Sequence, residues 1–354
     1  MRSTSPSSSV LTTLATPAIT IIVPTFNRAH CLRMLLGALK VELRGLEGRI
    51  AVVIGDNASS DGTPDVTWDF ALAWADTRVL RHENNVGPEE NFCRCVEQVR
   101  STYFWIIGDD DLPRAGAIRA LLELLERQKP DLLYMESRWT PTLTSHDEAG
   151  ATGPLRASLN DRSTFARRVH VWTTFISGCI VRTAFVSTSS LRLYTGTSLV
   201  QLGWIFGALK QGTRFVHVAT PCVLATSGAS GGYAVLKVFG QNFPRIARDA
   251  LSGTRALDTL AADIVSRASI AYLPNLVWDL REAKAGNFDQ SESVTTTLGP
   301  ELGRTLPYRL LIKPMVDASP RVAKGLLKLS HVATRIVSLL DLLHARLSGS
   351  LHAL

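Results

Sequence analysis

Short apolar runs rich in β-branched residues alternate with longer segments of helical period between residues 18 and 136. The runs predict strands at 19–23, 50–54, 78–82, 103–107 and 131–135. The segments between them predict helices at 28–43, 63–75, 89–99 and 115–128. Strands separated by helices of this length are typical of βαβ units. We therefore expect an α/β fold with an open, twisted, mainly parallel sheet that carries helices on both faces.

Polar clusters follow four of these strands: "PTFNR", "GDNASSDGT", "ENNVGPEEN" and "GDDD", in chain order. Each cluster stands where its predicted strand ends. Parallel strands end at the same edge of a sheet, and open α/β sheets bind their ligands at that edge. We therefore expect the four clusters to converge on one binding site.

The cluster "GDDD" places Asp109, Asp110 and Asp111 directly after a strand that we expect to be buried. Neighbouring carboxylates raise one another's pKa unless a cation or solvent relieves the repulsion, and this stretch contains no basic residue. Mg²⁺ and Mn²⁺ prefer oxygen ligands and complete their shell with water and substrate phosphates. We expect a metal site with Asp110 and Asp111 as ligands; the alternative is that one aspartate caps the next helix.

The first two clusters suit a nucleotide. Asp56 and Asn57 end the second strand, where a carboxylate and an amide can hydrogen-bond to a base or ribose, and where Asp56 would support little core packing. In "PTFNR", backbone N–H groups and Asn27 lie close to a helix start, a position suited to phosphate oxygens. Arg28 is either a partner of the diphosphate or an exposed helix residue. For Asp61, a turn or helix cap is the better interpretation.

The segments "ITIIVPTFNR", "VVIGDNASSDGT", "NNVGPEENF" and "YFWIIGDDD", in this order, resemble the nucleotide-sugar-binding half of family 2 glycosyltransferases with the GT-A fold. The "GDDD" variant is similar to the bacterial branch that includes abequosyltransferase-like enzymes of surface-polysaccharide assembly. The resemblance is specific over residues 18–135 and weaker to residue 240. It implies transfer of a sugar from a nucleoside-diphosphate sugar to a glycan or lipid-linked acceptor, with Mn²⁺ or Mg²⁺ as cofactor.

The same resemblance implies roles for individual residues and parts of the chain. The implied donor contacts are Pro24, Thr25, Asn27, Arg28, Asp56, Asn57, Asn85, Gly87 and Asp109. Position in the fold suggests that the acceptor contacts are Tyr194, Ser198, Gln201 and Trp204. The expected organisation is a flexible leader at 1–17, a GT-A domain at 18–240 with donor and acceptor halves divided after residue 136, and a helical region at 241–354.

The catalytic base is not evident. Inverting members of the family use a carboxylate near the start of the helix expected here at 198–211, but no Asp or Glu stands between Asp161 and Asp249. Gln201, an amide that cannot act as a base, falls roughly at the expected position. The base candidates are Asp147, Glu148 and Asp161, in an irregular connection expected at 137–175, with Glu136, His170 and His217 as further options. The missing acid leaves open a catalytically degenerate domain that binds nucleotide sugar or glycan as an assembly partner.

The C-terminal region is basic and amphipathic. From residue 301 onward, eight Lys or Arg stand against three acidic residues. Helical spacing places Arg321, Lys324, Lys328, His331 and Arg335 on one face. Another face is apolar and comprises Val322, Leu326, Leu329, Ile336, Leu340, Leu343 and Leu347. This pattern favours either peripheral binding to an anionic membrane or packing on the catalytic domain with the basic side in solvent.

Composition, charge and motifs restrict the classes of protein and of binding partner that fit this sequence. Hydrophobic residues make up 45% and charged residues 19%, as expected for a folded protein. No apolar run approaches the roughly 18 residues of a membrane-spanning helix, and the five scattered cysteines favour reduced thiols in a cytoplasmic protein. The net charge of +7 lies largely in the tail without an aromatic platform motif, which argues against a nucleic-acid partner. The first strand is not followed by G-x-G-x-x-G, which argues against a Rossmann dehydrogenase, nor by a basic Gly-rich loop, which argues against a nucleotidyltransferase.

Overall fold

The first half of the chain forms the expected alternation of strands and helices. The computed structural model describes residues 16–143, 149–227, 232–282, 292–347 and 351–353. The strands are β1 (Ile19–Thr25), β2 (Ile50–Asp56), β3 (Thr77–Arg81) and β4 (Tyr103–Ile106). The helices are α1 (Ala29–Glu42), α2 (Thr63–Ala73), α3 (Pro88–Val96) and α4 (Ala117–Gln128). Each predicted strand and helix of this half is confirmed.

One sheet unites the described strands, in the order β10-β7-β9-β6-β8-β4-β1-β2-β3, with β5 beside β9. The strands beyond β4 are β5 (Leu112–Pro113), β6 (Leu132–Thr140), β7 (Ala157–Asn160), β8 (Cys179–Arg182), β9 (Phe215–Thr226) and β10 (Leu351–Ala353). The strands β1 to β4 pair in parallel, and β8 runs antiparallel between β4 and β6. Because β6 and β9 are parallel to each other and point the same way as β1, six strands end at one edge, which we call the binding edge.

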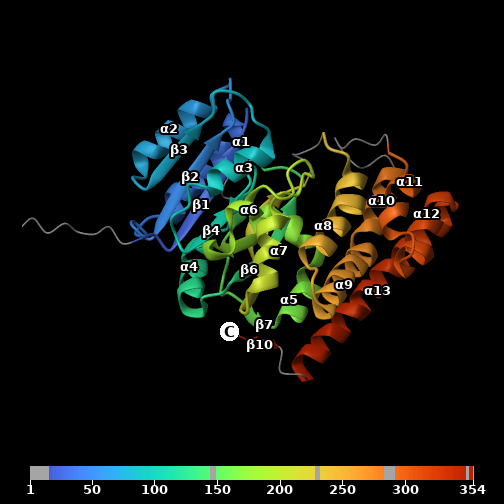
Figure 1. Ribbon diagram of the computed structural model, residues 1–354. Coiled ribbons are helices and arrows are strands. Elements are labelled where there is room, and N and C mark those ends of the chain that lie inside the picture. The colour runs from blue at the N-terminus through green and yellow to red at the C-terminus, as the bar shows by residue number, and fades with distance from the viewer. Residues whose placement is uncertain (1–15, 144–148, 228–231, 283–291, 348–350, 354) are drawn as a thin grey trace, which may run out of the picture.

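Helices cover both faces of this sheet (Figure 1). Side chains alternate along β1, so that Ile21 and Val23 pack with α1, α2 and α4, whereas Ile22 packs with the helices of the opposite face. That second face carries α3, α5 (Arg162–Val169) and α7 (Leu202–Gln211), with the short α6 (Thr188–Leu191) before α7. The two-sided cover explains why the inner strands β1, β2 and β4 are almost continuously apolar, whereas the edge strand β3 carries Arg78 and Arg81.

The expected irregular connection at 137–175 is wrong in part. The strand β6 continues to Thr140, and β7 and α5 follow within the predicted connection. The sequence of β7, "ASLN", has only four residues, and α5 has eight, so neither is long enough to show a periodic pattern. Tertiary packing fixes both elements, because Phe165 and Val169, one helical turn apart, are fully buried in the core.

The C-terminal part is helical and packs on the sheet domain. Its helices are α8 (Phe243–Ala250), α9 (Arg255–Ala271), α10 (Leu273–Arg281), α11 (Val294–Leu302), α12 (Lys313–Asp317) and α13 (Pro320–Leu347). One apolar cluster contains Phe104 from β4, Trp204 from α7 and Ile264 from α9. The helical region therefore shares a core with the sheet domain. None of the described helices is both long and apolar enough to cross a membrane.

Two helical glycines provide a test of this packing. A Cβ on Gly203 in α7 would lie 2.7 Å from the carbonyl oxygen of Ser190, whereas a Cβ on Gly37 in α1 would meet no atom within 4 Å. We expect Gly203→Ala to lower the free energy of unfolding by about 1–3 kcal/mol, because the backbone of α6 must move. We expect Gly37→Ala to raise it by roughly 0.5–1 kcal/mol, because alanine loses less entropy in a helix. Urea denaturation measures both; equal effects would contradict this packing.

Candidate active site

Arg28 supplies the positive charge that the three aspartates lack in their own stretch. Its Nη1 donates to Asp109 Oδ1 at 3.0 Å and to Asp110 Oδ2 at 2.8 Å. Thr25, the last residue of β1, donates its hydroxyl to the other oxygen of Asp109 at 2.7 Å. Burial raises the pKa of Asp109 to about 6, although the charge of Arg28 and the hydrogen bond from Thr25 act to lower it. These contacts connect the acidic turn, which we define as Asp109–Asp111 after β4, to the end of β1.

Asp111 points into the fold, where both of its oxygens accept hydrogen bonds. Oδ2 accepts the hydroxyl of Ser177 at 2.6 Å, and Oδ1 accepts the backbone N–H of Thr226 at 3.1 Å. Ser177 also accepts the backbone N–H of Gly108 at 2.9 Å. Burial, and next the charge of Asp110, raise the pKa of Asp111 to about 7. We therefore reassign Asp111 from metal ligand to the anchor that fixes the acidic turn against β9.

Asp56 is fully buried, contrary to the expectation that it adds little to the core. Its Oδ1 accepts the backbone N–H of Ser59 at 2.9 Å, and the guanidinium of Arg81 lies 3.7 Å from Oδ2. Within the described residues, Oδ2 has no hydrogen-bond partner. An unsatisfied buried acceptor is unusual and calls for an explanation, of which a missing ligand is one.

Asparagine side chains connect the loops that follow β1, β2 and β3. Oδ1 of Asn27, a residue with a φ of 52°, accepts the backbone N–H of Ser60 at 2.8 Å. Asn57 donates from Nδ2 to Asn85 Oδ1 at 2.9 Å and accepts the backbone N–H of Val86 at 2.9 Å. Three of the four polar clusters are thus held in one network at the binding edge. The predicted convergence of the clusters on one edge agrees with the structure.

Three other predicted residues contribute through the backbone or as caps. Gly87 precedes α3 with a φ of 84°, a left-handed conformation that favours glycine, and donates its N–H to Asn85 Oδ1 at 2.9 Å. Pro24 lies in β1 opposite Gly55 of β2. Asp61 accepts the backbone N–H of Ala29 at 3.1 Å, at the first residue of α1. Its Oδ1 also accepts the backbone N–H of Thr63, the first residue of α2, at 3.0 Å, which agrees with the expected turn or cap.

Asp109 and Asp110 form an oxygen pair that fits a hard divalent cation. Asp110 is the more accessible, with 16% of its side chain exposed against 7% for Asp109. In the part of the chain that the structure describes, no group of three or more His, Cys, Asp or Glu could hold an ion alone. Mg²⁺ typically needs one or two carboxylates and takes its other ligands from water and substrate phosphates. Two carboxylates alone do not fill the shell of such an ion, so the pair suits one whose other ligands come from water and from phosphate oxygens of a bound molecule.

Two of the predicted acceptor residues are turned into the core. Trp204 is 1% exposed and packs edge-to-face on Phe104, with ring centroids 6.3 Å apart. Tyr194 is 7% exposed, and its hydroxyl donates to Asp249 at 2.7 Å. The periodic pattern of α7 marked Trp204 correctly as part of a helix but not the direction of its side chain. Neither aromatic ring is available to an acceptor in this arrangement.

The other two predicted acceptor residues lie at the start of α7. Gln201 is buried and donates from Nε2 to the carbonyl oxygen of Thr174 at 3.1 Å. Ser198 is exposed at a φ of 61°. Gly196, two residues before Ser198, donates its N–H to Glu89 in the first turn of α3 at 2.6 Å. This segment therefore touches the donor half, and Ser198 alone of the four predicted residues has an exposed side chain.

Asp161 is not placed to act as a base at the binding edge. It is the N-cap of α5, where Oδ1 accepts the backbone N–H of Thr164 at 2.6 Å. The preceding Asn160 pairs with Phe215 at the beginning of β9. Asp161 therefore lies at the amino ends of the parallel strands, the edge opposite to the acidic turn. This base candidate is withdrawn on geometric grounds.

Asp147 and Glu148 lie outside the described residues. The chain is described again from Ala149, whose carbonyl oxygen accepts Nε of Arg114 at 2.8 Å. Gly150 follows, and its carbonyl oxygen accepts the backbone N–H of Ala115 at 2.9 Å. The residues after Glu148 are thus bonded to the chain just beyond the acidic turn, and both carboxylates stay predicted bases.

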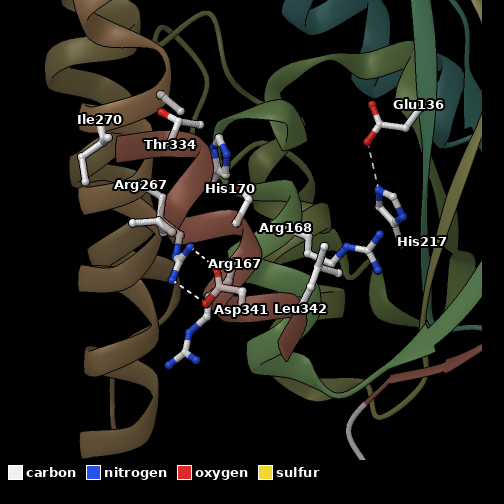
Figure 2. A pocket seen from close by; sticks show the side chains of 13 residues that line it. Glu136, Arg167, Arg168, His170, His217, Arg267, Ile270, Thr334, Asp341 and Leu342 are labelled. Atoms are coloured by element: carbon white, nitrogen blue, oxygen red, sulfur yellow. Dashed lines mark hydrogen bonds and ion pairs between the residues drawn. The ribbon is translucent and has the colours of Figure 1, made fainter. Parts of the chain in front are cut away.

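Glu136 and the two histidines line a cavity of about 160 Å³ between the sheet and the C-terminal helices (Figure 2). Glu136 and His217 are joined through Oε1 and Nε2 at 3.0 Å. Burial, and secondly the charge of Arg267, lower the pKa of His170 to about 4. The cavity is lined by none of the residues of the acidic turn. This position favours a structural role for His170 and His217 and does not support Glu136 as the base.

Comparison with known proteins shows which sequence family the residues of the binding edge resemble. Residues 20–192 match the sequence family described as "Glycosyl transferase family 2". Over this range, just under half of the chain, the sequence is similar to family 2 glycosyltransferases. The match begins in β1 and includes the four polar clusters, the acidic turn and Ser177. The protein is therefore a glycosyltransferase, and its binding edge is the part of the domain that the resemblance assigns to the nucleotide sugar. A comparison with curated protein sequences finds no match.

Several solved structures share the fold over nearly the whole chain. Staphylococcus aureus TarS 1–349 is 15% identical, with a TM-score of 0.58 over 94% of this chain and 91% of that one. Its complex with UDP-GlcNAc is 14% identical, with a TM-score of 0.59 over 94% and 92%. The mannosyltransferase PcManGT from Pyrobaculum calidifontis, in complex with GDP-Man and Mn²⁺, is 15% identical, with a TM-score of 0.51 over 92% and 88%. The GT-A-type fold of the glycosyltransferase is thereby confirmed, and the likeness extends into its helical region.

Sequence reasoning missed two supports of this glycosyltransferase site. Ser177 and Thr226 hold Asp111, yet they stand 66 and 115 residues beyond it in the chain. No local pattern distinguishes a serine or a backbone N–H that serves a distant carboxylate. The pairing of Arg28 with Asp109 spans 81 residues and was likewise not predicted. Arg28 was expected beside a diphosphate, and that role stays a prediction.

A substitution at Ser177 tests the anchor of the acidic turn. Ser177→Ala would leave the buried Asp111 and the N–H of Gly108 each without this partner. We expect a loss of about 1–3 kcal/mol in the free energy of unfolding, since unsatisfied buried polar groups are costly. The control is Ser137→Ala, because the buried hydroxyl of Ser137 has no hydrogen-bond partner among the residues that the structure describes, so its removal should be nearly neutral. Chemical denaturation that gave equal effects for the two variants would contradict the role of Ser177.

Proposed function

We propose that the protein transfers a hexosyl or deoxyhexosyl group from a nucleoside-diphosphate sugar to a glycan or lipid-linked acceptor. We place this reaction in the assembly of a bacterial surface polysaccharide such as O-antigen, in the abequosyltransferase-like branch of the family, at the cytoplasmic side of the membrane. The observation that carries the proposal is the convergence of four polar loops and an acidic pair on one edge of a GT-A-type sheet. Solved relatives bound to UDP-GlcNAc and to GDP-Man support a nucleotide-sugar donor.

The donor site is divided between a nucleoside end and a phosphate end. Asp56 and Asn57 lie at the end of β2, where they suit the polar groups of a base or ribose; Oδ2 of Asp56 accepts no hydrogen bond from the described residues and has only the guanidinium of Arg81 nearby, at 3.7 Å. Asp109, Asp110 and Arg28 suit the diphosphate end. Opening of the ion pair between Arg28 and the acidic turn would turn its guanidinium toward phosphate oxygens.

The reaction itself needs a displacement at the anomeric carbon. An acceptor hydroxyl attacks that carbon, the bond to the diphosphate oxygen breaks, and the diphosphate leaves with the electron pair. The proton of the hydroxyl passes to a base, for which Asp147 and Glu148 are the predicted residues. A Mn²⁺ or Mg²⁺ ion held by Asp110 and Asp109 would supply positive charge next to the leaving diphosphate. Arg28 provides a further positive charge at the same place.

A second candidate function is a domain that binds nucleotide sugar without turning it over. The observation that favours it is Gln201, a buried amide where family members carry a base. Both functions predict donor binding, but only the enzyme releases nucleoside diphosphate from the donor. A release assay with donor, Mn²⁺ and acceptor therefore separates the two.

Donor binding is testable by thermal shift against UDP-, GDP-, CDP- and dTDP-sugars with Mn²⁺. A donor at 100 times its Kd adds about 2.7 kcal/mol of stability. We expect Asp110→Asn, or removal of the ion with a chelator, to weaken donor binding by at least the roughly 10- to 100-fold that is typical when a residue supporting a metal ligand is changed.

The matched control for Asp110 is Asp69→Asn, which removes the same charge from an exposed position on α2. Asp69→Asn should bind the donor as the wild type does. Donor affinity that stayed at the wild-type value in Asp110→Asn, and that did not change when a chelator was added, would exclude the metal role of Asp110. Absence of binding for all four nucleotide classes would count against the proposed function as a whole.

An exposed tryptophan beside the acidic turn suits the acceptor. Trp139, near the end of β6, is 46% exposed and packs on Phe175 with ring centroids 4.8 Å apart. The next residue, Thr140, pairs with Thr226, whose N–H donates to Asp111. Exposed aromatic rings at a binding edge offer apolar area with little loss of entropy, which suits the apolar face of a sugar ring. We therefore propose Trp139 as an acceptor contact in place of Trp204.

Loss of this ring should affect the acceptor and not the donor. We expect Trp139→Ala to raise the KM for the acceptor about 10-fold, as for a tryptophan at the centre of an interface, with an unchanged donor Kd. Trp68→Ala is the control, because Trp68 is 54% exposed on α2 and far in sequence from the acidic turn. Steady-state kinetics with varied acceptor measures both variants. Equal acceptor KM values for Trp139→Ala and the wild type would rule out this contact.

A further inference from the structure

The C-terminal helix α13 is held to the protein by one side only. It runs along the outer margin of the helical region, beside α9 and α10 (Figure 1). Ala323 and Ser330 on its inner side are fully buried. Arg267 of α9 forms a two-point ion pair with Asp341, and His331 contacts Asn275 Oδ1 at 2.8 Å. These contacts fix the rotation of α13, so its outer side cannot turn inward.

The outer side of α13 is an apolar stripe that no described residue covers. Seven large side chains on it are between 51% and 61% exposed: Val322, Leu329, Val332, Ile336, Leu339, Leu340 and Leu343. At about 100° per residue, their spacing of three, four and seven residues gathers them within roughly a third of the circumference. The stripe extends over about 30 Å at 1.5 Å per residue. A contiguous apolar surface of this length marks an interaction site.

Positive charge runs along one border of the stripe. Arg321, Lys324, Lys328 and Arg335 are exposed there, three of them seven residues apart. The only acidic residue between positions 320 and 347 is Asp341, which is paired with Arg267 on the inner side. The outer side of α13 therefore presents apolar and cationic groups without an opposing carboxylate. Its partner must be apolar and anionic.

A second copy of α13 fits this surface poorly. In a coiled coil with Val322, Leu329 and Ile336 at the a positions, Arg321, Lys328 and Arg335 would take the g positions. Stable pairs place opposite charges at e and g, but the e positions of this helix carry Leu326, Ala333 and Leu340. Antiparallel pairing would bring the basic rows together. Neither a parallel nor an antiparallel pair of α13 helices neutralises the positive charge of Arg321, Lys328 and Arg335.

We propose that the outer face of α13 docks the protein on an anionic lipid surface. The apolar stripe enters the boundary between headgroups and acyl chains, and the basic border contacts lipid phosphates. Membrane binding and packing on the catalytic domain, which the sequence left as alternatives, are then served by opposite sides of one helix. This inference does not depend on the proposed sugar transfer, because vesicle binding is measured without donor or acceptor.

The test is co-sedimentation of the full chain with phosphatidylglycerol vesicles and with phosphatidylcholine vesicles at low salt. The wild type should sediment with the first and stay in solution with the second, and salt should weaken its binding. Each basic residue near an anionic surface contributes roughly fivefold in partitioning. We therefore expect Arg321→Glu/Lys328→Glu/Arg335→Glu to reduce vesicle binding by at least about 100-fold.

Two further variants separate charge from apolar insertion. Leu329→Ser/Ile336→Ser/Leu343→Ser changes only exposed side chains, so the variant should fold normally by circular dichroism and yet lose vesicle binding. The control Arg33→Glu/Lys40→Glu/Arg127→Glu makes the same charge change at exposed positions of α1 and α4 and should bind as the wild type does. The proposal is overturned if the wild type ignores phosphatidylglycerol, or if the control and the α13 charge variant bind equally. It is also overturned if the serine variant dissolves a dimer seen by sedimentation velocity without lipid.

Discussion

The ion pairs of Arg28 with Asp109 and Asp110 hold together the part of the structure on which the proposed chemistry depends. Three adjacent aspartates at the end of a buried strand repel one another and are costly to ionise. Arg28 lowers that cost from the start of α1, at 3.0 Å and 2.8 Å from the two carboxylates. The third aspartate, Asp111, is stabilised separately by Ser177 and Thr226. Within the acidic turn, Asp109 and Asp110 thus form an outward pair held by the charge of Arg28, and Asp111 forms an inward anchor held by hydrogen bonds.

This division explains how one short motif can stabilise the fold and also serve the proposed reaction. The anchor fixes the turn against β9, so that the outward pair is positioned by a rigid element and not by a loose loop. Asparagine bridges then link the loops after β1, β2 and β3 to each other at the same edge. The loops of the proposed donor site are consequently held by contacts within the chain itself, and Oδ2 of Asp56 keeps its hydrogen-bonding capacity free of any described partner. Preorganised sites of this kind lose less free energy on binding.

Periodicity predicted the elements of the donor half because its inner strands are apolar on both faces and each helix has one buried side. It predicted the convergence of the polar clusters for the same reason, since parallel strands end together. Periodicity could not predict which side chains of a helix face inward. Trp204 was expected at the acceptor but lies in the core. Val332 and Leu339 were not included in the apolar face of α13, yet both are exposed on it. Contacts between distant residues, such as Arg28 with Asp109, leave no local trace in the sequence.

The most direct test of the central claim is hydrogen exchange of backbone amides, measured by mass spectrometry with and without a bound nucleotide sugar. If the four loops form one donor site, the donor should slow exchange in residues 24–28, 55–59, 85–87 and 108–111 together, while the cavity lined by Arg168 and Arg267 stays unchanged. Protection confined to that cavity or to the helical region, with the four loops unaffected, would contradict the account.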